Sequence, residues 1–534
     1  MGFLSLHTQD VILRMTARRS LQFLQLMKLF SSPILKLLLP SLIVFLLLRW
    51  GFWLAVFPNP DEAYYWLWGQ HPALSYYDHP PFQAWVQGLF TAIFGRSTFT
   101  LRLPNLITNC IFFYVYYQIA RYLYGKQEQN AFWIMVACIV ASPLYFLFLA
   151  LAWHDHLLIT FSLLSAYWLI QFLDRYLINP AASSWRLYAA AIALGLAGLS
   201  KYNAAFMALG FLATIVVDPR LRPLLRDRRL YIATAIGLSC LLPILLWNLS
   251  NDWQSVHYYF NRSVNPVSGL SLKFSPFFNF VLFSFLLVSP FNWMVFWRSL
   301  KQSPALLSHS IYAKVAVWTF IIPTVILTII SLLSAALYYW NITAYLLLFP
   351  LIPALFLPPS PSSSLFSSSP PLPPSQTKFL IAGQLYGLLF AGLLVIHYGL
   401  LPISALISPT EDPDSRMLYG WNTVATEVRK QTPELGEQPL LLTTDYRSAS
   451  ALAYELNEPN VLAISDRIDQ FDFWFQPDQH TGKNALILSD DWHPMQPELL
   501  AQFERTTAPQ TIAVRRFGIW IKRYYLRQAF GFKG

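Results

Sequence analysis

Long apolar runs recur along most of this chain and restrict it to a helical protein that crosses a membrane many times. The first of them covers Leu37 to Phe57. About 20 apolar residues are needed for a helix to cross the hydrocarbon core of a bilayer. Charged residues make up only 12% of the 534 residues, about half of their share in soluble domains. A soluble globular protein is therefore excluded.

At this length scale the sequence predicts an α-helical polytopic membrane protein with about eleven transmembrane helices within residues 38–400. The stretch 186–217 is too long for one helix and is interrupted by Ser200-Lys201-Tyr202-Asn203. We expect it to form two short helices that meet at Lys201. The other expected spans lie near 38–57, 103–122, 131–150, 157–177, 230–249, 277–297, 311–335, 338–357 and 378–400.

Basic residues stand mainly at the ends of apolar runs, where they act as orientation signals. The net charge of +10 therefore does not indicate a nucleic-acid partner. By the positive-inside rule, the basic N-terminus (1–37) is expected in the cytoplasm. The first outer loop (58–100) and the tip at Lys201 then face outward. The three cysteines all lie in apolar runs, so they form neither a disulfide framework nor a metal set.

Toward the C-terminus the composition of the sequence changes twice. Residues 358–377 contain a Pro/Ser tract, which predicts a flexible cytoplasmic linker. Residues 404–534 regain charge, and their short apolar runs alternate with helical patterns. This alternation predicts a small soluble α/β domain, and an odd number of spans places it outside the membrane, opposite the N-terminus.

Two adjacent carboxylates, Asp61 and Glu62, open the first outer loop. An acid pair at a membrane boundary is costly unless it stays hydrated or has a function. One interpretation is structural, with an acid in the first turn of a helix after Pro60. The other is catalytic, because a carboxylate here could take a proton from an acceptor hydroxyl. The aromatic residues that follow, including Tyr64 and Tyr65, are typical of an interfacial belt or of a surface that stacks on sugars.

A second polar cluster in the same loop is Asp78-His79-Pro80-Pro81. The two prolines predict a rigid turn into a helix that begins near Phe82. His79 could donate to a phosphate, orient Asp78, or be a satisfied interfacial histidine. Lys201 is a better candidate for binding a phosphate, because a lone lysine within the membrane is energetically costly without an anionic partner. The alternative for Lys201 is snorkelling to the interface.

The order of these motifs resembles a known enzyme family. The opening Asp-Glu, the later acid-base-Pro-Pro element, Asp155 in Trp153-His154-Asp155-His156, and the Gly195 to Tyr202 segment are similar to polyprenyl-phosphate-sugar glycosyltransferases of the GT-C class. Within that class the chain resembles glycosyltransferase family 39, which contains protein O-mannosyltransferases and the lipid A aminoarabinose transferase. C-terminal patterns around Leu418, Tyr446 and Gln470 resemble the bacterial members.

The resemblance implies inverting transfer from a lipid-phosphate sugar, with Asp61 as general base, Glu62 beside it, and Asp155 as a second site acid or an orienting group. Many relatives have Glu-Lys-Pro-Pro where this chain has Asp78-His79-Pro80-Pro81, so the phosphate contact shifts to Lys201 with its neighbour Tyr202. Substrate contacts are also expected from Asp78, His79, Arg262, Tyr64 and Tyr65. The relatives further imply Asp78 and His257 as a candidate pair for a divalent metal ion. The chemistry itself requires no cofactor, since a lysine or arginine can stabilise the leaving phosphate.

The predicted function is therefore a glycosyltransferase of the bacterial inner membrane. It would move a sugar from a polyprenyl-phosphate donor to a hydroxyl of a protein, lipid or glycan on the extracytoplasmic face. The alternative is a membrane transporter or lipid flippase with a periplasmic domain. A transporter should show internal repeats and polar residues near the bilayer midplane. The polar residues of this chain instead collect at one surface, which favours the enzyme.

Overall fold

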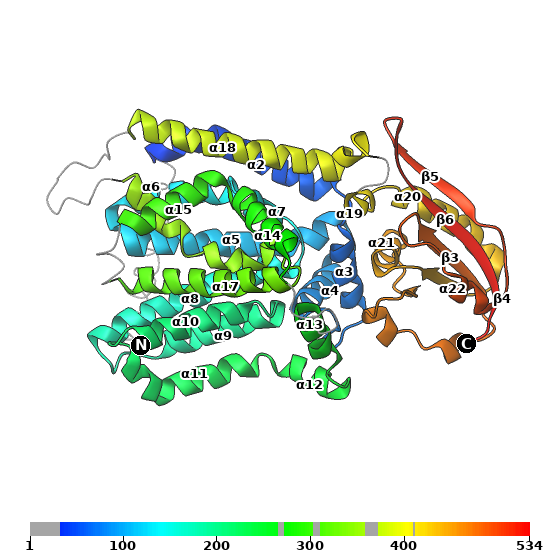
Figure 1. The fold of residues 1–534 in the computed structure, drawn as a ribbon, viewed down its shortest axis with the longest axis horizontal. Coiled ribbons are helices and arrows are strands. Elements are labelled where there is room, and N and C mark those ends of the chain that lie inside the picture. The colour runs from blue at the N-terminus through cyan, green and yellow to red at the C-terminus, as the bar shows by residue number, and fades with distance from the viewer. Residues whose placement is uncertain (1–31, 265–271, 303–309, 358–371, 409–411) are drawn as a thin grey trace, which may run out of the picture.

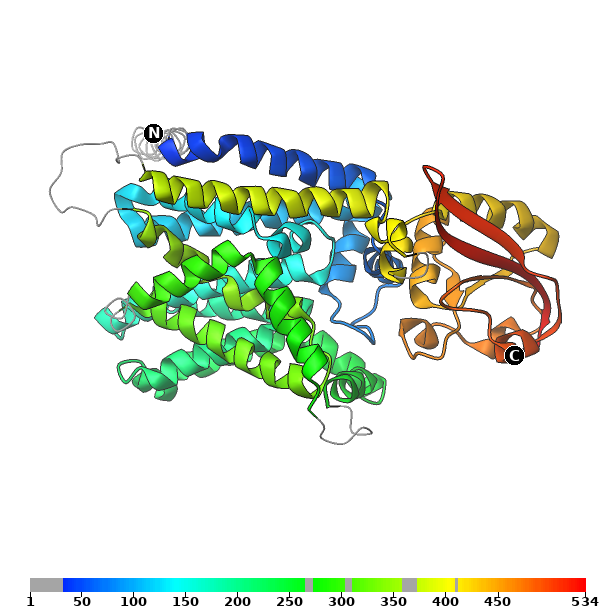
Figure 2. The same ribbon diagram turned by 45° about the horizontal axis from the view of Figure 1, so that its top comes forward.

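The computed structural model describes residues 32–264, 272–302, 310–357, 372–408 and 412–534. Long helices run side by side in a bundle, and a β-sheet stands beyond one end of that bundle (Figure 1). The turned view in Figure 2 gives the same arrangement. Most of the basic N-terminus (1–37) and of the Pro/Ser linker (358–377) lies outside the described residues, so both assignments stay predictions, as do the domain boundaries.

Four described helices are long and apolar enough to cross a membrane, or up to seven if each of three bent pairs counts as one span. The four are α2 (Pro33–Ala55), α8 (His154–Ile178), α17 (Ile311–Leu333) and α18 (Pro374–Val395), which continues to Leu400. They identify an integral membrane protein. The two short helices expected around Lys201 are confirmed as α9 (Trp185–Ser200) and α10 (Ala204–Val217). The total of about eleven spans stays a prediction.

Several spans that were expected to be continuous are broken near prolines, and this corrects the sequence prediction. Proline lacks a backbone N–H and clashes with the preceding helical turn. The breaks separate α6 (Glu128–Val140) from α7 (Pro143–Phe148), α11 (Arg228–Ser239) from α12 (Leu242–Ser250), α14 (Phe274–Val288) from α15 (Pro290–Gln302), and the 3-10 segments η4 (Tyr338–Tyr345) and η5 (Phe349–Leu355). The bend reaches 89° between α14 and α15.

The C-terminal part is a six-stranded mixed sheet. Strands β2 (Val461–Ala463), β1 (Leu440–Thr443) and β3 (Ala485–Asp490) are parallel neighbours, and α21 (Tyr446–Leu456) joins β1 to β2. These elements confirm the predicted α/β pattern. The sequence prediction missed the antiparallel half, in which β6 (Ile519–Phe532) pairs with β3, β4 (Phe503–Thr506) and β5 (Gln510–Arg516).

The first outer loop is folded and lies between the bundle and the sheet (Figure 1). It contains α3 (Pro60–Gln70) and α4 (Phe82–Phe94), which begins at the residue expected from the two prolines. Gly69 and Gly88 bring the two helices into backbone contact, because a Cβ on Gly69 would lie 2.7 Å from the nitrogen of Gly88.

The aromatic side chains of α3 are buried, so they form an interdomain core and not an exposed belt. Trp66 packs against Tyr454 of α21 with ring centroids 5.2 Å apart, and Tyr64 stacks on Phe471 at 5.8 Å. Burial of large aromatic rings is among the strongest apolar contributions to packing. This core fixes the C-terminal sheet against the first outer loop.

Candidate active site

A cavity of about 270 Å³ lies where the bundle, the first outer loop and the C-terminal sheet meet. It is bordered by seven of the residues that the sequence predicted for the site, which come from three separate parts of the chain. They are Asp61, Tyr64, Tyr65, Asp78, His79, Lys201 and Tyr202. The fold therefore brings together residues that the linear sequence scatters. Their individual roles stay predictions.

Asp61 occupies the first turn of α3 and faces this cavity. Asn59 caps the helix, and its side chain accepts a hydrogen bond from the backbone N–H of Asp61 at 3.1 Å. The Tyr446 hydroxyl donates to Oδ1 of Asp61 over 3.4 Å. Burial raises the pKa of Asp61 to about 6, although Arg447 and Arg467 oppose the shift. A carboxyl group with this pKa can act as a base near neutral pH.

Glu62 points away from the cavity into a fully buried ion pair with Arg102, with a shortest N–O distance of 2.7 Å. Its two oxygens also accept hydrogen bonds from the backbone N–H groups of Asn59 at 2.8 Å and Ala152 at 2.7 Å. Glu62 does not border the cavity. These contacts hold both the start of α3 and the segment that leads into α8.

Asp78 and His79 border the cavity from the turn before α4. Asp78 accepts a hydrogen bond from the Tyr64 hydroxyl at 2.7 Å and forms an ion pair with Arg467 of the C-terminal domain. The Nδ1 atom of His79 lies 2.6 Å from the hydroxyl of Tyr259. The Asp78–Arg467 pair links the first outer loop to the C-terminal domain at the rim of the site.

Lys201 and Asp155 form a nearly solvent-free ion pair beside the cavity. Nζ of Lys201 donates to both oxygens of Asp155, at 2.8 and 2.9 Å, and lies 4.9 Å from the ring centre of Tyr339. The side chains of Lys201 and Asp155 are 6% and 0% exposed. Nε2 of His154 is 3.3 Å from the same carboxylate. Lys201 borders the cavity and Asp155 lies behind it, so Asp155 fixes the position of the ammonium group.

The two remaining residues predicted for the site are His257 and Arg262. His257 on α13 (Gln254–Val264) is exposed and does not border the cavity, whereas its neighbours Tyr258 and Tyr259 do. The side chain of Arg262 lies outside the part of the chain whose side chains are described. The proposed metal pair of Asp78 and His257 therefore stays a prediction.

Two residues of the C-terminal domain that border the cavity, Arg467 and Tyr446, were not among the predicted site residues. Arg467 lies over the ring of Tyr446, 4.5 Å from its centre. Tyr446 belongs to one of the C-terminal patterns of the family resemblance, and that pattern was the only signal for it. Arg467 follows a short strand in an otherwise ordinary loop, where nothing in the sequence points toward the membrane.

Comparisons with known proteins support the resemblance. The family model described as dolichyl-phosphate-mannose-protein mannosyltransferase matches residues 78–247. The lipid A galacturonosyltransferase RgtD of Rhizobium johnstonii is 24% identical over 290 residues, which are 53% of this chain and 58% of that protein. The lipopolysaccharide core galacturonosyltransferase RgtA of the same organism is 30% identical over 193 residues, 36% of this chain and 37% of that protein. The matches thus span roughly a third to three fifths of these relatives.

Solved structures extend the likeness to nearly the whole fold. ArnT from Cupriavidus metallidurans in the apo state has a TM-score of 0.57 at 14% identity, over 93% of this chain and 98% of that one. The same protein bound to undecaprenyl phosphate has a TM-score of 0.55 at 15% identity, over 92% and 97%. The chain therefore has the ArnT-like GT-C fold. The resemblance to GT-C glycosyltransferases of the family 39 type is confirmed.

Proposed function

We propose that this chain is an inverting membrane glycosyltransferase that moves a sugar from a polyprenyl-phosphate donor to a hydroxyl of a lipid, glycan or protein acceptor. The observation that carries the proposal is the shared cavity of Asp61 and Lys201. It offers a base for the acceptor and a cation for the donor phosphate. The related lipid A and core galacturonosyltransferases, and the structure of ArnT with bound undecaprenyl phosphate, support the same class of reaction.

The placement of charge supports an extracytoplasmic site in a bacterial inner membrane. α10 begins beside the cavity and ends near Asp218, which pairs with Arg220 and with Lys314 at the start of α17. These basic groups thus gather at the end of the bundle away from the C-terminal sheet. By the positive-inside rule that end faces the cytoplasm, which leaves the C-terminal domain and the cavity outside.

In the proposed reaction Asp61 accepts the proton of the acceptor hydroxyl as its oxygen attacks the anomeric carbon of the donor sugar. The bond from that carbon to the phosphate oxygen breaks, and the polyprenyl phosphate leaves with the electron pair. Lys201, held by Asp155, and Arg467 stabilise the negative charge that develops on the phosphate. Attack from the face opposite the leaving group inverts the configuration at the anomeric carbon.

No step of this mechanism passes through a metal ion. Asp78 already contacts Tyr64 and Arg467, and His257 is exposed outside the cavity lining. A metal ion held by these two residues therefore stays a prediction, and no step is assigned to it. The leaving group is a phosphate whose charge Lys201 and Arg467 can stabilise by themselves.

The general test is transfer in proteoliposomes. We expect the purified chain to release a radiolabelled sugar from its polyprenyl phosphate and attach it to lipopolysaccharide or another acceptor. NMR of the product linkage would then establish inversion. Ion-coupled uptake of a solute without any transfer would contradict the proposal and support a transporter.

The rate of transfer should depend on pH through Asp61. Its pKa is raised to about 6, and the base must be ionised to act. The rate should therefore be near its plateau at pH 7 and fall about tenfold for each unit below about pH 5.5, because the ionised fraction falls by that factor. Single-turnover rates between pH 4.5 and 8 would measure this profile. A rate that stays constant down to pH 5 would contradict the role of Asp61.

Removing the charge of Lys201 should slow transfer by about 10²–10³-fold, the usual effect of losing one preorganised group that stabilises developing charge. Lys201→Met alone would leave the carboxylate of Asp155 buried and unpaired, which destabilises the fold. The informative variant is therefore Lys201→Met with Asp155→Asn, which removes both charges. Thermal unfolding checks that it folds, and single-turnover kinetics measure the loss. Full activity in the folded double variant would refute the phosphate role.

A further inference from the structure

A second and larger hollow of about 820 Å³ lies in the C-terminal domain. It opens at the carboxyl ends of the parallel strands β1, β2 and β3, the edge at which open α/β sheets bind ligands. We call it the strand-end crevice. Tyr446 and Arg467 border both this crevice and the catalytic cavity, so the two spaces adjoin. Its volume is within the usual range for small-molecule sites, about 300–1,000 Å³.

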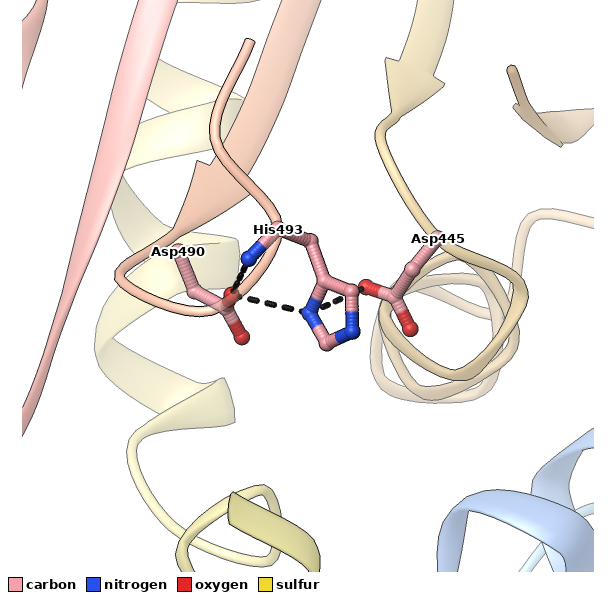
Figure 3. Close-up of side chains that lie close together, drawn as sticks. All are labelled: Asp445, Asp490 and His493. Carbon is pink, nitrogen blue, oxygen red and sulfur yellow. Dashed lines mark hydrogen bonds and ion pairs between the residues drawn. The ribbon is translucent and has the colours of Figure 1, made fainter. Parts of the chain in front are cut away.

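Asp445, Arg447 and His493 border the crevice and belong to an ion-pair network, three side chains of which are drawn in Figure 3. Nδ1 of His493 lies 3.0 Å from Asp490 and 3.7 Å from Asp445, and the hydrogen bond that it donates to the Asp490 carboxylate raises the pKa of His493. Lys522 is fully buried and pairs with the second oxygen of Asp490 at 2.7 Å. Arg447 approaches the other carboxylate, with its Nε atom 3.7 Å from Asp445.

Two aspartates and a histidine this close could hold a metal ion. The chain's own cations, Lys522 and Arg447, already neutralise them, and Oδ1 of Asp490 also accepts hydrogen bonds from the backbone N–H groups of Trp492 and His493. A divalent cation would face two fixed positive charges at close range. The network is therefore better suited to shaping a site than to binding a metal.

Two buried polar atoms in this network have no hydrogen-bond partner within the described part of the chain. They are Oδ2 of Asp445, an acceptor, and Nε of Arg447, a donor. Both residues border the crevice. Buried polar atoms are rarely left unpaired, so each such atom calls for an explanation. A neighbouring acceptor and donor match a ligand hydroxyl, which donates one hydrogen bond and accepts others.

The other residues that border the crevice are of the kinds found in carbohydrate-binding sites. Trp492 and Tyr446 offer half-buried aromatic rings, and Gln496 and Gln502 offer amide groups. Acidic and basic side chains both border the crevice, so no strong charge of one sign favours a bare anion. Aromatic rings beside a few polar groups suit the apolar faces and the hydroxyl edges of sugars.

We propose that the strand-end crevice binds the saccharide part of the acceptor and directs one of its hydroxyl groups past Tyr446 and Arg467 toward Asp61. This inference rests on the proposed glycosyl transfer. It assigns acceptor recognition to the C-terminal domain, while the donor lipid lies among the membrane helices. Asp445 and Arg447 contact the sugar hydroxyls, and Trp492 stacks on a sugar face.

The test measures binding and transfer separately with the full-length chain in nanodiscs. The probes are the soluble, de-acylated carbohydrate portion of lipopolysaccharide and, for the donor side, undecaprenyl phosphate. The variants are Asp445→Asn, which keeps a residue able to cap α21, and Trp492→Ala. The matched controls are Asp478→Asn and Phe517→Ala, at exposed positions outside the crevice. Calorimetry gives each Kd, and kinetics give the KM for the acceptor.

We expect both crevice variants to weaken saccharide binding about tenfold, through a lost hydrogen bond to a charged group in Asp445→Asn and a lost aromatic stacking contact in Trp492→Ala. Binding of undecaprenyl phosphate and the controls should stay unchanged. Equal saccharide affinity in variants and wild type, or inorganic phosphate displacing the saccharide, would overturn the proposal. If transfer occurs with an unchanged acceptor KM in the variants, only the crevice proposal fails. If the saccharide binds through the crevice and no sugar is ever transferred, only the proposed function fails.

Discussion

Asp61→Asn is expected to reduce the rate of glycosyl transfer by about 10²–10⁴-fold, the usual contribution of a general base. The amide has nearly the shape of the carboxylate, and the helix cap contacts only the backbone of residue 61. The fold and the cavity should therefore persist. Binding of the donor lipid should change little, because the cations proposed to contact its phosphate, Lys201 and Arg467, are untouched. Single-turnover transfer and a direct lipid-binding assay would separate the two effects.

The matched control is Asp252→Asn, which removes an exposed acid from the turn before α13. Asparagine also tolerates the positive φ of 48° at that position. This variant should keep the wild-type rate. An Asp61→Asn enzyme that transfers at the wild-type rate would refute the assignment of the base. A loss of rate in both variants would instead indicate a general electrostatic effect on the outer surface.

Local signals in the sequence were sufficient for much of the site. Lys201 interrupts an apolar stretch, and a buried ammonium needs a partner, so its position at the meeting point of two short helices could be predicted. The turn at Pro80-Pro81 likewise predicted the start of α4. These predictions succeeded because each depends on a few neighbouring residues.

Other features depend on tertiary contacts and could not be predicted. Asp61 and Glu62 are adjacent acids, and successive residues of a helix point about 100° apart. Only the position of Arg102, 40 residues later, determines which acid is buried in an ion pair. Arg467 reaches the site through the packing of an entire domain. The prolines near the helix breaks, such as Pro290, can be read in the sequence. A prediction from hydropathy nevertheless treats the two apolar segments on either side of each break as one continuous span.

Arg102→Ala is expected to destabilise the chain by about 3–5 kcal/mol, the typical cost of removing one partner from a buried ion pair. Arg102 holds both oxygens of Glu62 and also donates to the backbone carbonyls of Phe52, Trp53 and Val56 at the end of α2. Its loss would leave a buried carboxylate and several carbonyl groups without their donor. Thermal unfolding in detergent, monitored as the fraction of folded protein that remains after heating, would measure the loss.

The expected pattern across variants distinguishes a structural ion pair from a catalytic acid. Arg175→Ala, which removes an exposed arginine near the end of α8, should change stability little. Glu62→Gln should destabilise the chain less than Arg102→Ala, because the amide oxygen can still accept one of the hydrogen bonds. Glu62→Gln should also keep the pH profile of transfer, since that profile belongs to Asp61. A Glu62→Gln enzyme with the unfolding temperature of the wild type but without the change in rate near pH 6 would contradict this assignment. It would indicate that Glu62 itself takes part in the reaction.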